Sequence, residues 1–363
     1  MNKAENNSTI VFVIPNLKIG GAQRIFVNYI RSINKDKFNI YLILINKAGS
    51  FVDQIPNHVK MVNLDIRRTR FGFFKLLNNI KRINPDLIVS TTNYLNLLVL
   101  FASIFVSKKT RVCLYEPSMP SAQIKNKHFP KYYFWLMRVL YTRADYIIAQ
   151  TDEMKEEIIR YYAQPKNDII VTINPLDKEL INSQLDGVKN PYLNDKINVI
   201  VSGRISKEKG QDFLVQSFEE VVRKNANFKL NILGAIGNRE YYDELLKLVE
   251  DLNITEHIEF LGFKNNPYPY YKYADLLVLP SRWEGLPNVV LEAFFLQTPV
   301  VVTNCIPFFK RFIKDGKNGY VVETDDITGM SKAILNYSEL IVDKEIVPEV
   351  DMEQIFNKMI FNE

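Results

Sequence analysis

Two glutamates bracket a short turn in the segment SRWEGLPNVVLEA, residues 281–293. Glu284 lies at the turn, where a carboxylate can accept hydrogen bonds from the hydroxyls of a sugar. Glu292 lies roughly two helical turns further on, where it can reach the paired hydroxyls of a ribose. The alternative is that Glu284 only complements a helix dipole and that Glu292 is a solvated helix residue. The pair therefore indicates a small-molecule site, and other segments must decide which molecule.

The turn between these glutamates predicts an anion site. Pro287 suits the first residue of a helix, because its φ is already helical and its missing N–H would be unpaired there. The free amides around Gly285 and Leu286, with the positive end of the helix dipole, would favour a diphosphate. We therefore expect a nucleotide to bind here through its phosphates.

Two cations follow a strand in SGRISKEKG, residues 202–210. Arg204 comes directly after the strand, and Lys209 stands five residues later, before a helix. Arginine would engage diphosphate oxygens as a fork and lysine as a point charge. No Asp-X-Asp pair follows a strand, so the sequence predicts no metal site. A solvated basic turn is the alternative interpretation.

A third element is the Gly20-Gly21 pair in PNLKIGGAQR, residues 15–24. It lies between the first predicted strand and the first predicted helix, where backbone amides without side chains can approach a phosphate or sugar. The dinucleotide fingerprint G-X-G-X-X-G is absent. A simple tight turn is the alternative.

These residues need strands that end at one edge of a sheet. Near-continuous apolar runs alternate with helical periodicity, which predicts parallel sheets covered on both faces. The predicted strands are 8–14, 38–46, 87–91, 111–116, 145–150 and 168–173, and then 197–204, 228–234, 258–262, 274–281 and 299–304. A polar segment with Pro and Gly, residues 174–196, separates the two series and is interpreted as a linker.

The fold class is therefore α/β, with two doubly wound, Rossmann-like domains facing each other across a cleft. We expect an N-terminal domain at 1–180, a C-terminal domain at 181–345 and a last helix within 346–363. The sequence leaves open whether this helix returns to the first domain. Ligands of such sheets bind beyond the carboxyl ends of the strands.

Composition agrees with a globular protein that is soluble or peripheral to a membrane. The chain has 363 residues, 47% hydrophobic and 24% charged, enough for two cores. Its longest apolar run, 95–106, is shorter than the roughly 20 residues of a membrane span. Two isolated cysteines favour a reducing compartment. Residues 1–180 carry a net charge of +12 and residues 181–363 one of −7, which suggests different partners for the two halves.

Together the motifs carry a family resemblance. The E-X7-E pattern of EGLPNVVLE, the GRISKEKG turn, GGAQR, YADLLVLPSRWEG and TINPLD (172–177) resemble the retaining GT-B glycosyltransferases of family 4. The resemblance runs over nearly the whole chain in the expected order. It implies a nucleotide-sugar donor on the second domain, an acceptor on the first, and no metal or other cofactor.

The resemblance also implies roles for single residues. Arg204 and Lys209 would hold the donor's distal phosphate, Glu284 the transferred sugar and Glu292 the ribose. The Gly20-Gly21 loop would lend an amide of Gly21 to the phosphates, and Phe263 would line the base pocket. Such enzymes are thought to use front-face substitution, in which the leaving diphosphate takes the acceptor's proton, so that stabilising its charge is the main catalytic task.

The chain departs from the family in one place. Members often carry a donor-contacting histidine after the strand that corresponds to RVCLYE, and here Glu116 stands near that position. Glu116 would either replace the histidine or mark a partly disabled sugar site.

Two basic, aromatic segments, 66–83 and 124–143, suit an anionic membrane surface, although ordinary helices with solvated basic faces fit the pattern as well. Nucleic acid is not expected, because no recognition motif accompanies the charge. The sequence thus predicts a retaining enzyme on the cytoplasmic face of the membrane. It would move a hexose or N-acetylhexosamine from a UDP-linked donor to a lipid-linked glycan in cell-surface polysaccharide synthesis. The alternatives are a silent sugar-nucleotide-binding subunit of a synthase and a nucleotide-sugar epimerase.

Overall fold

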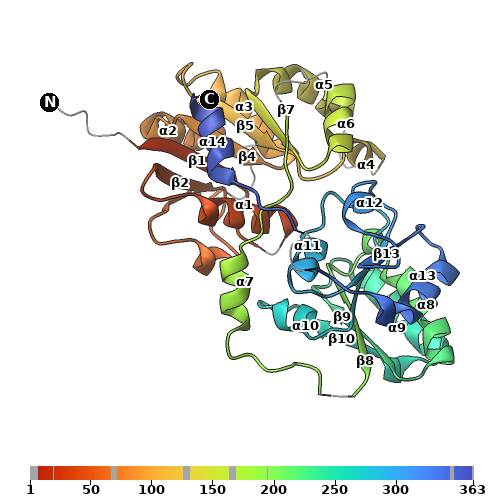
Figure 1. Ribbon diagram of the computed structural model, residues 1–363. Coiled ribbons are helices and arrows are strands. Elements are labelled where there is room, and N and C mark those ends of the chain that lie inside the picture. Colours follow the sequence, from red (N-terminus) through yellow and green to blue (C-terminus); the bar gives the residue numbers. More distant parts are fainter. Residues whose placement is uncertain are drawn as a thin grey trace. The chain divides into compact units, whose positions relative to one another are not determined.

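The chain forms two compact units in a computed structural model, shown in Figure 1. Unit 1 comprises Met1–Asp177 and Glu349–Glu363, and unit 2 comprises Lys178–Pro348. The structure describes residues 7–18, 20–66, 72–125, 131–162, 169–193, 195–343 and 347–361. Each unit is built on its own parallel sheet.

Unit 1 contains a seven-stranded parallel sheet in the order β3-β2-β1-β4-β5-β6-β7. Its central strands are apolar on both faces, as expected for a sheet between two helical layers. The chain order reverses between β1 and β4, which are neighbours. The strands are β1 (Ser8–Ile14), β2 (Phe38–Leu44), β3 (Lys60–Asn63), β4 (Leu87–Thr91), β5 (Arg111–Tyr115), β6 (Tyr146–Ala149) and β7 (Ile169–Val171).

Helices cover both faces of this sheet. One core lies under α2 (Phe73–Ile83), α3 (Asn93–Ser103), α5 (Lys131–Leu140) and α6 (Asp152–Tyr162). The other core lies under α1 (Gly21–Ser32) and the last helix, α14 (Met352–Phe361), which Figure 1 shows in blue beside the red strands of the same unit. From α14, the buried Phe356 ring meets Phe12 at a centroid distance of 5.9 Å. The C-terminal segment thus completes the core of unit 1. A short helix, α4 (Pro120–Lys125), packs on α6.

Unit 2 contains a six-stranded parallel sheet in the order β10-β9-β8-β11-β12-β13. Its core includes residues from α8 (Gln211–Lys224), α9 (Arg239–Asp251) and α13 (Ile327–Leu335). The remaining helices are α7 (Lys178–Leu185), α10 (Tyr268–Lys272), α11 (Asn288–Phe295) and α12 (Phe309–Phe312). The strands are β8 (Ile197–Ser202), β9 (Phe228–Leu233), β10 (Ile258–Gly262), β11 (Leu276–Leu279), β12 (Val300–Thr303) and β13 (Gly319–Val322).

The two parallel sheets confirm the predicted α/β class, and every predicted strand is present with its ends shifted by at most two residues. Two edge strands, β3 and β13, were not predicted, because both are short and largely exposed or half-buried. The linker prediction was wrong in one respect. Its middle forms α7, which buries Ile181 and packs on α10 within unit 2.

A buried carboxyl group lies at the end of β5. Glu116 is 0% exposed, and its two carboxyl oxygens accept hydrogen bonds from Gln123 Nε2 at 2.9 Å and from Tyr141 Oη at 3.3 Å. Gln123 is itself bound by Asn93 Nδ2 at 2.5 Å. Burial raises the pKa of Glu116 to about 7, although hydrogen bonds from Gln123, Tyr141 and Asn93 act to lower it.

This burial changes the interpretation of Glu116. A side chain that contacts a sugar needs an exposed face, and the Glu116 carboxyl group is enclosed by unit 1 side chains. The geometry therefore corrects the expectation that Glu116 directly replaces a donor-contacting histidine. Its contacts instead connect the end of β5 with α3, α4 and the turn after α5.

Glu116→Gln is expected to change how stability depends on pH. A carboxyl group whose pKa is raised on folding stabilises the protein below its unfolded pKa, and this contribution is lost as the pH rises through about 7. Between about pH 4.5 and 7 the wild type should lose up to ~1.4 kcal/mol per pH unit from this group. The neutral amide has no such loss, so the stability of the variant relative to wild type should grow from pH 5 to pH 8.

Urea unfolding followed by circular dichroism at several pH values measures this difference. Glu156→Gln, at an exposed position of α6, is the matched control and should keep the wild-type pH dependence. If the free energies of unfolding of Glu116→Gln and wild type changed with pH in parallel, the raised pKa of Glu116 would be contradicted.

Candidate functional site

The candidate site lies at the carboxyl edge of the unit 2 sheet. β8 and β11 are parallel neighbours, and the chain order of the strands reverses between them. The connections that follow these two strands run in opposite directions along the sheet, which leaves room for a ligand between them. Arg204 and Lys209 follow β8, and Glu284 follows β11. The topology thus brings the predicted cations and the first predicted glutamate to one place.

Lys209 and Glu284 are in direct contact. The ammonium Nζ lies 2.5 Å from Glu284 Oε1, with the two side chains 22% and 10% exposed. Ser281 Oγ donates a second hydrogen bond to the same carboxyl oxygen at 2.6 Å. The backbone carbonyl of Ser281 in turn accepts a hydrogen bond from Thr303 Oγ1, at the end of β12. Three neighbouring strands therefore fix the carboxylate of Glu284.

Glycine allows these loops to pack closely. Gly210, at the start of α8, has φ +65°, and a Cβ there would lie 2.1 Å from the carbonyl oxygen of Pro280. The loop after β9 approaches equally closely, since a Cβ on Gly237 would lie 2.4 Å from Cγ of Arg204. A side chain at position 210 would push the loops apart, and one at position 237 would displace the side chain of Arg204.

Arg204 is exposed, with its aliphatic part against Gly237. Its backbone carbonyl accepts a hydrogen bond from Gln211 Nε2 at 3.1 Å, which fixes the turn. Within the ranges that the structure describes, its guanidinium has no hydrogen bond or ion pair. Arg204 therefore belongs to the same edge as Lys209 and Glu284 without touching either of them, and its donors are available to a ligand.

The helix after Glu284 starts one residue later than predicted. α11 begins at Asn288, and Pro287 is its N-cap with an extended ψ of 111°. The side chain of Pro287 itself makes no capping hydrogen bond. Gly285 and the buried Leu286 lead into it, and Glu292 lies on the helix with a 7% exposed side chain. A buried glutamate does not fit the alternative of a solvated helix residue.

Two residues beside Glu284 were not singled out from the sequence. Ser281 orients Glu284, and its only signal was its proximity along the chain. Cys305 follows β12, and burial, together with the negative charge of Glu284, raises the pKa of its thiol to about 12. The thiol is therefore a neutral group at neutral pH, and it adds no charge to the cluster.

The other predicted site residues lie elsewhere. Phe263 follows β10, two strands away from β8, and is 37% exposed. In unit 1, Gly20 and Gly21 start α1 without a side-chain cap, and no protein atom lies within 4 Å of where a Cβ on Gly21 would be. The open side of Gly21 is compatible with a backbone contact to a ligand. Within unit 2, Phe263 therefore lies apart from the strands that carry the Lys209–Glu284 pair.

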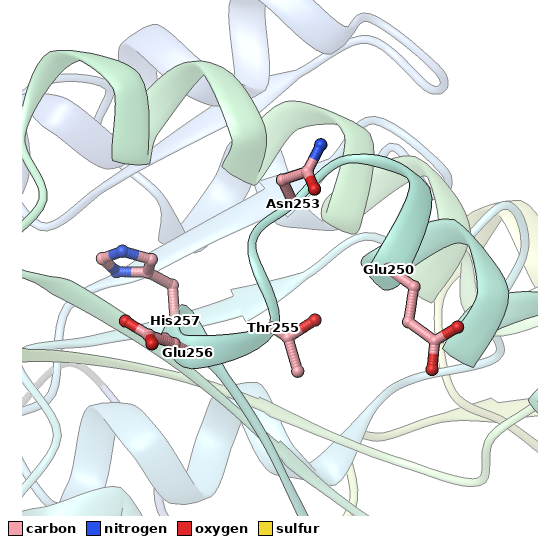
Figure 2. Close-up of a pocket in the computed structure, with 5 residues that line it drawn as sticks. All are labelled: Glu250, Asn253, Thr255, Glu256 and His257. Atoms are coloured by element: carbon pink, nitrogen blue, oxygen red, sulfur yellow. The ribbon is translucent and has the colours of Figure 1, made fainter.

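A pocket in unit 2 lies far from this chemistry. Its lining residues come from the turn between α9 and β10, at the amino end of a strand, which is the opposite edge of a parallel sheet. Figure 2 shows its five labelled side chains fanning out rather than converging. The ring of His257, one of the five, contacts the backbone carbonyl of Phe228 through Nδ1 at 3.1 Å. This pocket therefore offers no arrangement for catalysis.

Arg204 and Lys209 bring positive charge to the candidate site. Among the described residues, no cluster of three or more His, Cys, Asp or Glu side chains could hold a metal ion. A search of the described helices also found none that is both long and apolar enough to cross a bilayer.

Comparison with known sequences identifies the family. Two family models match the chain in succession: Glycosyltransferase Family 4 over residues 19–180 and Glycosyl transferases group 1 over residues 186–341. An uncharacterized glycosyltransferase of Methanocaldococcus jannaschii, MJ1059, is 33% identical over 241 residues, which cover 64% of this chain and 59% of that relative. The matched part thus spans well under two thirds of this relative.

A second relative and a solved structure match over greater lengths. The N-acetylgalactosamine-N,N'-diacetylbacillosaminyl-diphospho-undecaprenol 4-alpha-N-acetylgalactosaminyltransferase of Campylobacter jejuni is 27% identical, over 88% of this chain and 87% of the relative. The structure of Anabaena HepE in complex with UDP-glucose shares the fold, with a TM-score of 0.75 and 18% identity over 97% of this chain and 95% of HepE. Both halves are matched in order and the fold is shared, and the chain therefore belongs to the GT-B glycosyltransferases of family 4.

Proposed function

We propose that the chain is a retaining glycosyltransferase. It moves a hexose or N-acetylhexosamine from a UDP-linked donor to a lipid-linked glycan during cell-surface polysaccharide synthesis. The observation that carries the proposal is the contact between Lys209 and Glu284 at the point of the unit 2 sheet where ligands of this fold bind. HepE, solved with UDP-glucose, supports a UDP donor, and the name of the Campylobacter relative supports an undecaprenol-linked acceptor.

The donor would be held by charge at one end and by hydroxyl contacts at the other. Lys209 and Arg204 face the diphosphate, together with the amides at the start of α11. Glu284 accepts hydrogen bonds from the sugar, and Glu292 from the ribose. The ammonium of Lys209 has three donors and the carboxylate of Glu284 has two acceptor oxygens, so each group can contact the donor as well as the other.

In the transfer step, the bond between the anomeric carbon and the diphosphate oxygen breaks. The acceptor hydroxyl oxygen bonds to that carbon on the same face, and its proton passes to the leaving diphosphate. Negative charge grows on the diphosphate, so preorganised cations lower the barrier. We propose that Arg204, Lys209 and α11 supply this stabilisation without a metal, and that turnover is retained in EDTA.

Glu292→Ala is expected to abolish the thermal stabilisation that UDP gives to the native chain. A ligand at 100 times its Kd stabilises a protein by about 2.7 kcal/mol, and a donor without its ribose contact binds too weakly to do so. A thermal-shift panel of UDP- and GDP-sugars measures the effect and identifies the nucleotide.

Glu256→Ala is the control for that panel. It removes an exposed carboxylate from the pocket of Figure 2, in the same unit, and should leave the shift unchanged. An undiminished shift in Glu292→Ala would remove this residue from the ribose site.

Arg204→Ala is expected to reduce kcat by about 100-fold and donor affinity by much less. The reason is that a guanidinium aimed at the leaving group acts mainly in the transition state. Steady-state turnover and donor Kd, measured on the same preparation, separate the two quantities. Equal losses in both would show that Arg204 only holds the donor, and unaltered function in cells would favour a catalytically silent subunit.

An exposed aromatic face on unit 1 supports a membrane-bound acceptor. It lies on α2, on α3 with the turn that follows it, and on α5, where α3 packs against both other helices. The residues of this face are Phe74, Phe101, Ile104, Phe105, Tyr132, Trp135 and Val139. Exposed cations accompany them, namely Lys75, Lys108, Lys109 and Arg138. Residues 67–71 and 126–130 of the two predicted membrane segments lie outside the described residues.

Rings on this face pack on each other while their outer sides stay exposed. The Phe73 ring lies 5.0 Å from Phe101 and 5.3 Å from Phe74, centroid to centroid. Phe74 is 74% exposed and Trp135 is 63% exposed. Large apolar side chains flanked by cations suit the headgroup region of an anionic bilayer. We propose that this face docks unit 1 on the cytoplasmic leaflet.

Replacing both Phe74 and Trp135 by serine is expected to weaken binding to vesicles of phosphatidylcholine and phosphatidylglycerol by about tenfold, because two aromatic rings no longer leave water. Co-sedimentation at low salt measures the partition. Leu193→Ser, at a 96% exposed apolar position in unit 2, is the control. If the native chain stays in the supernatant with anionic vesicles at low salt, the membrane proposal is wrong.

A further inference from the structure

Arg282 joins the two loops that carry Lys209 and Glu284. Its backbone N–H donates to the carbonyl of Glu208 at 2.9 Å, and its Nη1 donates to the carbonyl of Lys207 at 2.8 Å. The guanidinium also grips Asp212 as a fork, with distances of 2.9 Å to Oδ1 and 3.0 Å to Oδ2. All these partners belong to the segment around Lys209, whereas Arg282 itself stands two residues before Glu284.

Further contacts make this connection rigid. Asp325, before α13, lies 2.8 Å from Nη2 of Arg282, and the arginine side chain is only 19% exposed. Tyr241 Oη donates to Asp212 Oδ1 at 2.8 Å from α9. Burial acts to raise the pKa of Asp212, but hydrogen bonds from Arg282 and Tyr241 outweigh it, so that the pKa lies below its usual value. The carboxylate thus stays charged at neutral pH, and a bidentate pair with arginine has a fixed geometry.

Two sets of contacts therefore join the same loops, and only one set involves no group that is assigned to the donor. The contact of Lys209 with Glu284 is made by two groups that are both assigned to the donor. None of the groups that Arg282 binds is assigned to the donor. The contacts of Arg282 therefore keep the loops at their distance without using any group that binds the donor.

We propose that Arg282 is a positioning residue that keeps Lys209 and Glu284 in register for binding the donor. This inference rests on the proposed function. Its physical basis is preorganisation, since a ligand binds tightly only if the loops do not have to be ordered by the ligand itself. Arg282 acts through its neighbours and does not touch the diphosphate.

Calorimetric titration of the full chain with UDP tests the proposal. Arg282→Gln is expected to weaken UDP binding by about tenfold. In a Lys209→Ala background the same change should weaken it less than about twofold, because the residue to be positioned is already absent. Arg282→Lys keeps the charge but not the fork, and it should resemble Arg282→Gln. Asp212→Asn breaks the same pair from the other side and serves if an Arg282 variant does not fold.

Arg239→Gln is the matched control. It removes the same charge from the same unit by breaking the exposed pair with Asp243, and it should bind UDP normally. Equal losses with and without Lys209, or wild-type affinity in Arg282→Lys, would overturn the positioning role, since they indicate a general effect on folding or on charge. No UDP binding by the native chain would overturn the proposed function as well, whereas normal binding by Arg282→Gln would overturn only this inference.

Discussion

Reversal of the strand order between β8 and β11 is the constraint on which the unit 2 site depends. In a parallel sheet all carboxyl ends share one edge, and only where the chain order reverses do the following loops diverge. Lys209 and Glu284, 75 residues apart in the sequence, meet at this point. The close packing of the two loops, with Gly210 against Pro280, then fixes the distance between these two side chains.

Unit 1 has the same sheet architecture, but the carboxyl group at its carboxyl edge has different surroundings. Its reversal lies between β1 and β4, and the uncapped start of α1 at Gly21 belongs to that edge. The edge also includes Glu116, but there the carboxyl group is turned into a network of amides and a phenol. A carboxylate at a strand end is therefore no sufficient sign of a ligand site. Its exposure and its partners decide its role.

Most of the fold could be predicted from the sequence, because buried parallel strands are continuous apolar runs such as β4. Lys209 and Glu284 could each be named from the sequence, since each stands in a recognisable segment after a strand, but their contact with each other was not predicted. Arg282 could not, because its partners Asp212 and Asp325 are distant in sequence and carry no spacing signal. The burial of Glu116 could not be predicted either, because the residues that enclose it lie on other elements. Asn93 lies on α3, which precedes β5, whereas Gln123 and Tyr141 lie in segments that follow β5.

The packing of α14 on unit 1 has a consequence for how the polypeptide matures. Phe12 and Tyr29 are synthesised early, and the ring of Phe356 can cover them only after the C-terminal segment has been made. Unit 2 is a single uninterrupted segment, so all of its residues are synthesised before those of α14. The earlier half of the chain therefore lacks part of its core until α14 has been made, and it exposes an incomplete apolar surface up to that point. The core of unit 1 thus depends on residues from both sides of unit 2 in the sequence.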